Sequence, residues 1–326
     1  MGCSLANSNS GLKILPVIVP VSTGLRSINF FLVKQENSLT LIDAGLNTEE
    51  CWDALQNTLK ENGYTLHDLT EILLTHHHID HVGLVNRVVA KHNIPVYAHP
   101  NALPRLKRDP DFLQMRVEFY KNLYKEMGCG EMGEKQVSYL RNAIIQNKDN
   151  KMDGDIQKIT DHQLLNFDVI ETFGHAPDQV AFFYKEQKWL FGGDLLIGHM
   201  SSNALVEPDS QGKRMQTLIQ HKHSLTNGLS LNAELVFSGH GITIENPNDL
   251  FQKRVNGMDK KAELFKTYIQ TGISTANEIA QTHYKQKYEK QFSLVMSEII
   301  GHLDYLEDQK KVKREFDRGV WHYFVR

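Results

Sequence analysis

The chain opens with three apolar stretches separated by turns. Residues 12–19, 26–34 and 38–43 are rich in β-branched and aromatic side chains, and Gly24 and a polar cluster around Asn37 separate them. Such runs predict strands, and their short connections predict antiparallel pairing. The chain is therefore expected to begin as an antiparallel sheet.

Beyond this opening, short apolar strands alternate with helical patterns. Residues 48–62 and 82–92 carry apolar side chains at helical spacing, and a strand is expected between them at 71–74. The stretch 101–147 is helical in pattern and predicts an insert, in which core packing is favoured over an apolar acyl pocket. Further strands are expected around residue 158 and at 169–173, 180–184, 189–191 and 235–238. Strands that alternate with helices predict an α/β fold.

The pattern changes near residue 250. Helices are expected at 254–269, 274–283 and 292–307, followed by short strands at 312–316 and 320–325 that are hinged at Gly319. Three helices and a terminal hairpin resemble a winged helix. We therefore expect two domains, residues 1–250 with the insert and residues 251–326.

Composition narrows the class of protein. With 326 residues, 40% hydrophobic and 23% charged, the chain is typical of globular proteins and not of collagen-like or mostly disordered ones. The net charge of −3 gives no overall attraction to nucleic acid or to an anionic membrane. No apolar run approaches the roughly 18 residues of a membrane span. Cys3, Cys51 and Cys129 are too few and too widely spaced for a disulfide framework, which favours a reducing, cytoplasmic compartment.

Histidines are numerous, 16 in all, and several lie together at the end of an apolar run. The strand expected at 71–74 leads directly into a loop that contains His76, His78, Asp80 and His81. Three imidazoles and a carboxylate within six residues predict a metal site, and nitrogen and oxygen ligands suit Zn, Fe or Mn. A solvated polyhistidine tract would explain neither the strand before the loop nor the helix after it.

Three other strands end in side chains of the same kind. His175, Asp194 and His240 each follow an apolar strand and a glycine, and glycine permits close approach of the backbone in a crowded centre. A lone histidine at a strand end is more often structural. Three such ends together with the histidine loop favour one shared metal site.

In this order, these residues resemble the HxHxDH loop, later His, bridging Asp and final His of the metallo-β-lactamase superfamily, over about residues 12–245. The resemblance implies a four-layer αβ/βα sandwich, here with a C-terminal winged-helix-like α+β appendage, and two zinc ions per chain, with Fe or Mn as alternatives. The implied ligands are His76, His78 and His175 for the first metal; Asp80, His81 and His240 for the second; and Asp194 between both. Asp43, at the end of strand 38–43, resembles the family's acidic residue beneath the metals and is expected to orient a ligand histidine.

A filled second site resembles dinuclear hydrolases of the glyoxalase II type rather than the mononuclear sulfur dioxygenase branch. The sequence departs from the glyoxalase II pattern at Asp178 and Gln179, where Gly-His is frequent.

The resemblance implies hydrolysis by a hydroxide that bridges two metals, with Asp80 as the catalytic residue that holds it. The expected substrate is a small-molecule ester, thioester or lactone. His199 and Arg214 are expected to meet a polar or anionic part of it. His77, between two ligands, is expected to be structural.

A second hypothesis is a metal-dependent ribonuclease or phosphodiesterase, or a nucleic-acid-binding protein, that uses the C-terminal domain. Residues 253–326 carry a surplus of four positive charges, but 291–309, where a recognition helix would lie, contains four acids and no Lys or Arg. Phosphate contacts require the opposite charge, so no sequence-specific nucleic-acid binding is expected. The remaining interpretation is that this domain packs on the hydrolase domain or on a second subunit of a homo-oligomer.

Overall fold

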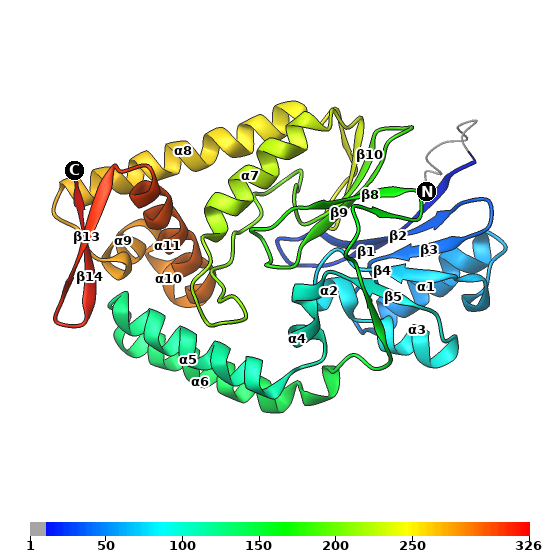
Figure 1. Cartoon of the computed structure of the whole chain (residues 1–326), viewed down its shortest axis with the longest axis horizontal. Coiled ribbons are helices and arrows are strands. Elements are labelled where there is room, and N and C mark those ends of the chain that lie inside the picture. Colours follow the sequence, from blue (N-terminus) through cyan, green and yellow to red (C-terminus); the bar gives the residue numbers. More distant parts are fainter. Residues whose placement is uncertain (1–10) are drawn as a thin grey trace.

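Two six-stranded sheets form the centre of the protein. The computed structural model of the chain describes residues 11–326, so Cys3 lies outside the described part, whereas Cys51 and Cys129 are buried free thiols. The sheets pack face to face, and helices cover the outer face of each (Figure 1).

The first sheet has the order β1-β2-β3-β4-β5-β6. Its strands are β1 (Lys13–Pro20), β2 (Ser27–Lys34), β3 (Leu39–Ile42), β4 (Glu71–Leu73), β5 (Val96–Ala98) and β6 (Ile156–Lys158). The opening strands β1 to β3 pair antiparallel, as their short connections predict, and β3 to β6 pair parallel.

The second sheet has the order β12-β11-β10-β9-β8-β7. Its strands are β7 (Gln163–Leu164), β8 (Phe167–Glu171), β9 (Val180–Tyr184), β10 (Trp189–Gly193), β11 (Leu235–Ser238) and β12 (Ile244–Glu245). Only β10 and β11 pair parallel among the described strands of this sheet, so both sheets are mixed.

Strand β2 shows how the sequence fills two cores at once. Phe30 and Leu32 point to the outer helices, whereas Phe31 and Val33 lie in the core between the sheets. Successive side chains of a strand point to opposite faces, so a strand that is covered on both faces is apolar at every position.

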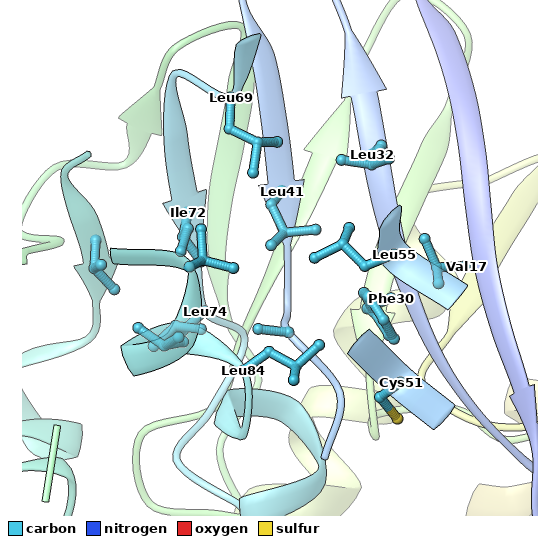
Figure 2. Close-up of a cluster of buried hydrophobic side chains, with 14 of the residues drawn as sticks. Val17, Phe30, Leu32, Leu41, Cys51, Leu55, Leu69, Ile72, Leu74 and Leu84 are labelled. Atoms are coloured by element: carbon cyan, nitrogen blue, oxygen red, sulfur yellow. The ribbon is translucent and has the colours of Figure 1, made fainter. Parts of the chain in front are cut away.

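Three helices cover the outer face of the first sheet: α1 (Glu49–Glu61), α2 (Ile79–Val82) and α3 (Val85–Lys91). Figure 2 shows this outer core, in which Leu55 of α1 and Leu84 at the start of α3 meet Leu41 and Ile72 of the sheet. On the other side, α7 (Thr217–Ser230) and the first turns of α8 (Asn248–Gln270) cover the second sheet.

The stretch 101–147 folds as a helical hairpin. It contains α4 (Leu103–Leu106), α5 (Pro110–Glu126) and α6 (Gly130–Gln146), and the turn uses Gly128 at a φ of +73°. The hairpin packs against the C-terminal helices through side chains such as Val117, Tyr120 and Leu123 (Figure 1). These apolar positions are therefore core, the interpretation favoured above.

The C-terminal part consists of helices and a terminal hairpin. Its elements after α8 are α9 (Ala276–Tyr284), α10 (Gln286–Lys290), α11 (Phe292–Asp308), β13 (Val312–Asp317) and β14 (Val320–Val325). Single turns of 3₁₀ helix lie elsewhere in the chain, at Leu66–Asp68, Pro100–Ala102 and Lys148–Asn150.

Helix α8 begins at Asn248, six residues before the start that the sequence pattern predicts at residue 254. Phe251 and Val255 lie in the core of the second sheet, whereas Ala262, Phe265 and Ile269 lie in the C-terminal core. One uninterrupted helix therefore belongs to both cores. No helix in the described residues 11–326 has the length and apolar character needed to cross a membrane.

Candidate metal centre

The histidines and carboxylates predicted as ligands lie where strands end at one edge of the two sheets. His175, Asp194 and His240 follow β8, β10 and β11, which all run in the same direction. Asp43 and the histidine loop follow the parallel strands β3 and β4 of the other sheet. Side chains that are more than a hundred residues apart in sequence therefore converge at one place.

Glycine makes this convergence possible. A Cβ on Gly193, which has a φ of +48°, would lie 2.7 Å from the Thr75 hydroxyl. A Cβ on Gly239 would lie 2.6 Å from the His81 ring and 2.7 Å from an oxygen of Asp194. Larger side chains at either position would push the strands apart.

Three imidazoles form the first group. His78 Nδ1 faces His76 Nε2 at 3.0 Å and His175 Nε2 at 2.9 Å. Ligand atoms of the three residues lie within 4.8 Å of one another. The group is the one that the resemblance implies for the first metal.

Asp80, His81 and His240 form the second group, again with ligand atoms within 4.8 Å. Asp194 lies between the groups: one carboxylate oxygen is 3.4 Å from His81 Nε2, and the other is 3.3 Å from His240 Nε2 and 3.5 Å from His175 Nε2. The structure thus brings together all seven side chains that the sequence singles out.

The ring nitrogens that point away from the centre have fixed partners. His81 Nδ1 donates to Asp43 at 2.8 Å, His240 Nδ1 to the Ser27 carbonyl at 2.8 Å, and His175 Nδ1 to the Asn203 carbonyl at 2.8 Å. A proton held on the outer nitrogen leaves the inner nitrogen with a free lone pair. The Asp43 carboxylate also accepts hydrogen bonds from the backbone and hydroxyl of Thr75, each at 2.8 Å, and so fixes the start of the histidine loop.

The electrostatics differ between the groups. Burial and the neighbouring imidazoles hold the pKa values of His76 and His78 well below the ordinary value, so both rings are neutral at pH 7. Burial also opposes a proton on His81, but the carboxylates of Asp43 and Asp194 outweigh it and raise the pKa of His81. The second group therefore has an electronegative character that favours a cation.

Three buried atoms of the centre lack hydrogen-bond partners within the described chain, and they test whether a metal fits. These are His81 Nε2, His240 Nε2 and Asp194 Oδ1. A buried polar atom without a partner costs about 1–3 kcal/mol. Imidazole nitrogen and carboxylate oxygen are ligands of divalent metals, so cations at this place would satisfy all three atoms. The residues fit a metal centre.

A buried contact that sequence analysis missed joins the two loops of the first group. His77 points away from the centre, and its Nδ1 lies 2.6 Å from a carboxylate oxygen of Asp178, which is completely buried. Burial opposes ionisation of Asp178, but His77 and the nearby Arg105 outweigh it and lower the pKa of that carboxyl. The only sequence signal was the departure from the family pattern at Asp178.

A second missed contact anchors the helical hairpin to the segment between β10 and α7. The buried Glu207 carboxylate accepts hydrogen bonds from Arg105 at 2.9 Å, from Arg116 Nε at 2.7 Å and from the Tyr120 hydroxyl at 3.0 Å. Burial opposes its charge, but the two guanidinium groups lower the pKa of Glu207 far below its ordinary value.

The two residues predicted to meet substrate lie in different places. His199 is near the second group, because a Cβ on Gly241 would lie 2.8 Å from His199 Nδ1. Its Nε2 donates to the Gly24 carbonyl at 2.9 Å. Arg214 instead pairs with Asp304 of α11 at 2.7 Å, and no hydrogen bond or ion pair in the described chain joins it to the centre.

Comparison with known proteins agrees with this geometry. A family model described as the metallo-beta-lactamase superfamily matches residues 23–240, which include all seven side chains. The chain belongs to the metallo-beta-lactamase superfamily. A relative from Bacillus subtilis (strain 168), named probable metallo-hydrolase YqjP, is 31% identical over 301 residues, 92% of this chain and 93% of its own length.

Solved structures of this superfamily share the whole fold. A metallo-beta-lactamase family protein from Thermus thermophilus is 25% identical with a TM-score of 0.77, covering 97% of this chain and 99% of its own. A beta-lactamase domain protein from Burkholderia ambifaria is 17% identical with a TM-score of 0.78, covering 99% and 94%. The likeness includes the C-terminal helices and hairpin. Family membership and the His/Asp clusters together make the chain a probable metallo-hydrolase.

Proposed function

We propose that this chain is a dinuclear metal-dependent hydrolase that cleaves an ester, thioester or lactone of a small molecule. The observation that carries the proposal is the convergence of seven His and Asp side chains, three of whose buried inner atoms lack other partners in the described chain. His76, His78 and His175 would hold one metal and Asp80, His81 and His240 the other, with Asp194 between them. Zinc is the proposed metal, with iron or manganese as alternatives for the same ligand chemistry.

Two bound divalent cations would supply a water-derived nucleophile at neutral pH and polarise the substrate oxygen. The chain's own residues provide the geometry. Asp80 is partly exposed beside His240, at 3.4 Å from its Nε2, and is the carboxylate that orients the attacking water and takes up its proton. Asp43 keeps the His81 proton on the outer nitrogen, and His199 contacts a polar part of the substrate.

Acyl substrates are favoured by one curated relative. A Pseudocercospora fijiensis protein named atrochrysone carboxyl ACP thioesterase is 23% identical over 227 residues, which are 68% of this chain and 50% of that protein. The match thus spans about half the length of that relative. A thioester therefore belongs among the substrates to be tested first.

The C-terminal part is proposed as a winged-helix-like domain, residues 251–326, with a structural role. The helix at the position of a recognition helix, α11, is mostly buried, and its acids Glu298 and Asp304 pair with the partly exposed Lys261 and Arg214. A helix buried in this way has no free face for a nucleic-acid groove. Buried free thiols at Cys51 and Cys129 support a reducing, cytoplasmic location.

A panel of substrates tests the proposal. The zinc-supplemented full chain is given a nitrophenyl ester, an acyl thioester, a lactone, a phosphodiester and RNA, with and without chelator. Chelator-sensitive hydrolysis of one or more acyl substrates is expected. Cleavage of the phosphodiester or RNA alone would replace the proposal by the nuclease hypothesis, and no hydrolysis by metal-loaded protein would contradict both. Submicromolar, salt-resistant binding of a defined duplex would overturn the structural role of the C-terminal part.

A further inference from the structure

The segment between β10 and α7 holds the outer nitrogen of one candidate metal ligand. His175 Nδ1 donates to the Asn203 carbonyl at 2.8 Å, and the Ser202 hydroxyl lies 2.9 Å from the same nitrogen. Both partners come from consecutive residues of one segment. Residues 201–207 of this segment have neither helical nor strand structure. Contacts with neighbouring elements therefore set its position, because it has no hydrogen-bond ladder of its own.

Helix α11 supplies two of these contacts. The Asn203 side-chain amide donates to the Leu294 carbonyl of α11 at 3.2 Å. Three residues later, the Val206 backbone amide donates to the Ser297 hydroxyl of α11, also at 3.2 Å. Val206 is 1% exposed and packs in the C-terminal core. Helix α11 thus holds the segment both at the residue that supports His175 and three residues beyond it.

The helical hairpin holds the far end of the same segment. The Tyr120 hydroxyl of α5 lies 2.6 Å from the Val206 carbonyl oxygen. The buried Glu207 carboxylate accepts hydrogen bonds from Arg105 and Arg116. All of these partners lie outside the two sheets. The position of the segment therefore depends on how the hairpin and α11 are docked.

Two ligand histidines of the second group are held differently. His81 Nδ1 donates to Asp43, which directly follows strand β3. His240 Nδ1 donates to the carbonyl of Ser27, the first residue of strand β2. Both partners belong to the first sheet or to its edge. Of these three histidines, His175 is the one whose outer partner is positioned by elements outside the sheets.

We infer that Asn203 is a positioning residue, which ties the orientation of His175, and with it the affinity of the first metal site, to the docking of α11. The backbone of Asn203 holds the imidazole, and its side chain holds α11. Partners of this kind fix the ring orientation on which metal affinity depends. The inference rests on the proposed metal centre, and it extends the role of the C-terminal part from packing to the control of one metal site.

The coupling acts in both directions. Because docking of α11 favours metal at the first site, metal at that site must favour docking of α11 to the same degree. The backbone amide of Val206, which donates to Ser297, should therefore exchange with solvent more slowly when the first site is loaded.

Titration of the metal-free full chain with cobalt in competition with a chelating dye tests the inference, and the cobalt spectrum tells the two sites apart. Asn203→Leu keeps the backbone carbonyl and the shape of the side chain but removes the donor to α11. It should lower the affinity of the first site about three- to tenfold, the effect of one neutral hydrogen bond. Ser297→Ala, on α11 itself, should lower it by a similar factor. Both variants should change the second site less than about twofold.

Hydrogen exchange supplies a readout other than affinity. In the unmodified chain, metal should slow exchange of the Val206 amide more than that of the Leu55 amide of α1, and Asn203→Leu should remove most of this difference. The matched control is Asn62→Leu, because the Asn62 side-chain amide also donates to a helix carbonyl, that of Thr58 on α1, at 2.9 Å. It should leave both affinities and the exchange of Val206 unchanged.

Three results would overturn the inference. They are first-site affinities of the Asn203→Leu and Ser297→Ala variants equal to that of the unmodified chain, an equal loss at both sites, and exchange of the Val206 amide that metal slows no more than that of Leu55. The second would show a general structural defect. Failure of the unmodified chain to bind cobalt would refute the metal centre itself, and this inference with it.

Discussion

Replacing Asp178 by Asn should weaken metal binding in the first group while leaving the second nearly unchanged. All three imidazoles of that group come from two loops, one with His76 and His78 and one with His175. The contact between His77 and Asp178, 2.6 Å long and buried, ties these loops together. Asp178 is therefore a positioning residue that touches no ligand atom of the centre.

The expected size of the effect follows from that contact. A hydrogen bond to a charged group contributes about 1.5–3 kcal/mol, and each 1.4 kcal/mol is about a factor of ten in affinity. Mutation of groups that orient metal ligands typically costs about 10–100-fold in affinity. We expect Asp178→Asn to lower the affinity of the first site by at least about tenfold. The second site should change less than about threefold, because Asp43 holds His81 independently.

Titration of metal-free protein with cobalt against a chelating dye measures both affinities, and the visible spectrum of cobalt reports the geometry of each site. Asp168→Asn is the matched control, because Asp168 is a carboxylate on β8 that pairs with Lys185 at 2.7 Å, away from the centre. Equal affinities in Asp178→Asn and in the unmodified chain would refute the positioning role. An equal loss at both sites would show a general structural defect instead.

Elemental analysis should find about two metal ions per chain, and a single ion after zinc supplementation would contradict a dinuclear centre. Asp194→Ala should lower the occupancy of both sites, and His240→Ala should mainly empty one. Asp80→Ala should reduce kcat far more than it raises KM in steady-state assays, since it disturbs the nucleophile and not uniform binding; an acyl-enzyme adduct in mass spectrometry would oppose this mechanism. Glu207→Gln should cost up to about 3–5 kcal/mol in urea unfolding of metal-free protein, because it leaves the partly buried Arg105 and Arg116 without a counter-ion. The control Glu131→Gln, at an exposed position, should change stability by less than about 0.5 kcal/mol. Because the pKa of Glu207 is lowered in the folded protein, its ion pairs stabilise the fold above its ordinary pKa of 4.5, and this stabilisation is lost as pH falls below that value. The free energy of unfolding of the variant should therefore decrease less steeply in acid. An unchanged pH dependence would count against the ion pair.

The ligand set was predictable because each candidate ligand follows an apolar strand with a recognisable local pattern. His76, His78 and His81 lie within six residues of one another, and His175 and His240 each follow a strand and a glycine. The predicted ligands come together in the structure because the strands that precede them end at one edge of the two sheets.

The contacts that support the centre were not predictable in the same way. His77 and Asp178 are 101 residues apart, and Arg105 and Glu207 are 102 residues apart, so no local spacing relates them. Arg214 was predicted to contact substrate because of its charge. In the structure it pairs instead with Asp304 of α11, 90 residues later in the sequence. Pairing of distant charges depends on how the helical hairpin and α11 dock, and the sequence pattern does not encode that docking.

Helix α8 has a consequence for how the protein can be divided. Phe251 and Val255 cover the second sheet, and burying such side chains contributes about 1.5–3 kcal/mol each. The same helix continues into the C-terminal core through Phe265 and Ile269. A nick or truncation within α8 would uncover apolar surface on both sides at once, so the hydrolase layers and the C-terminal helices should melt in a single cooperative transition and exchange their core amide protons together.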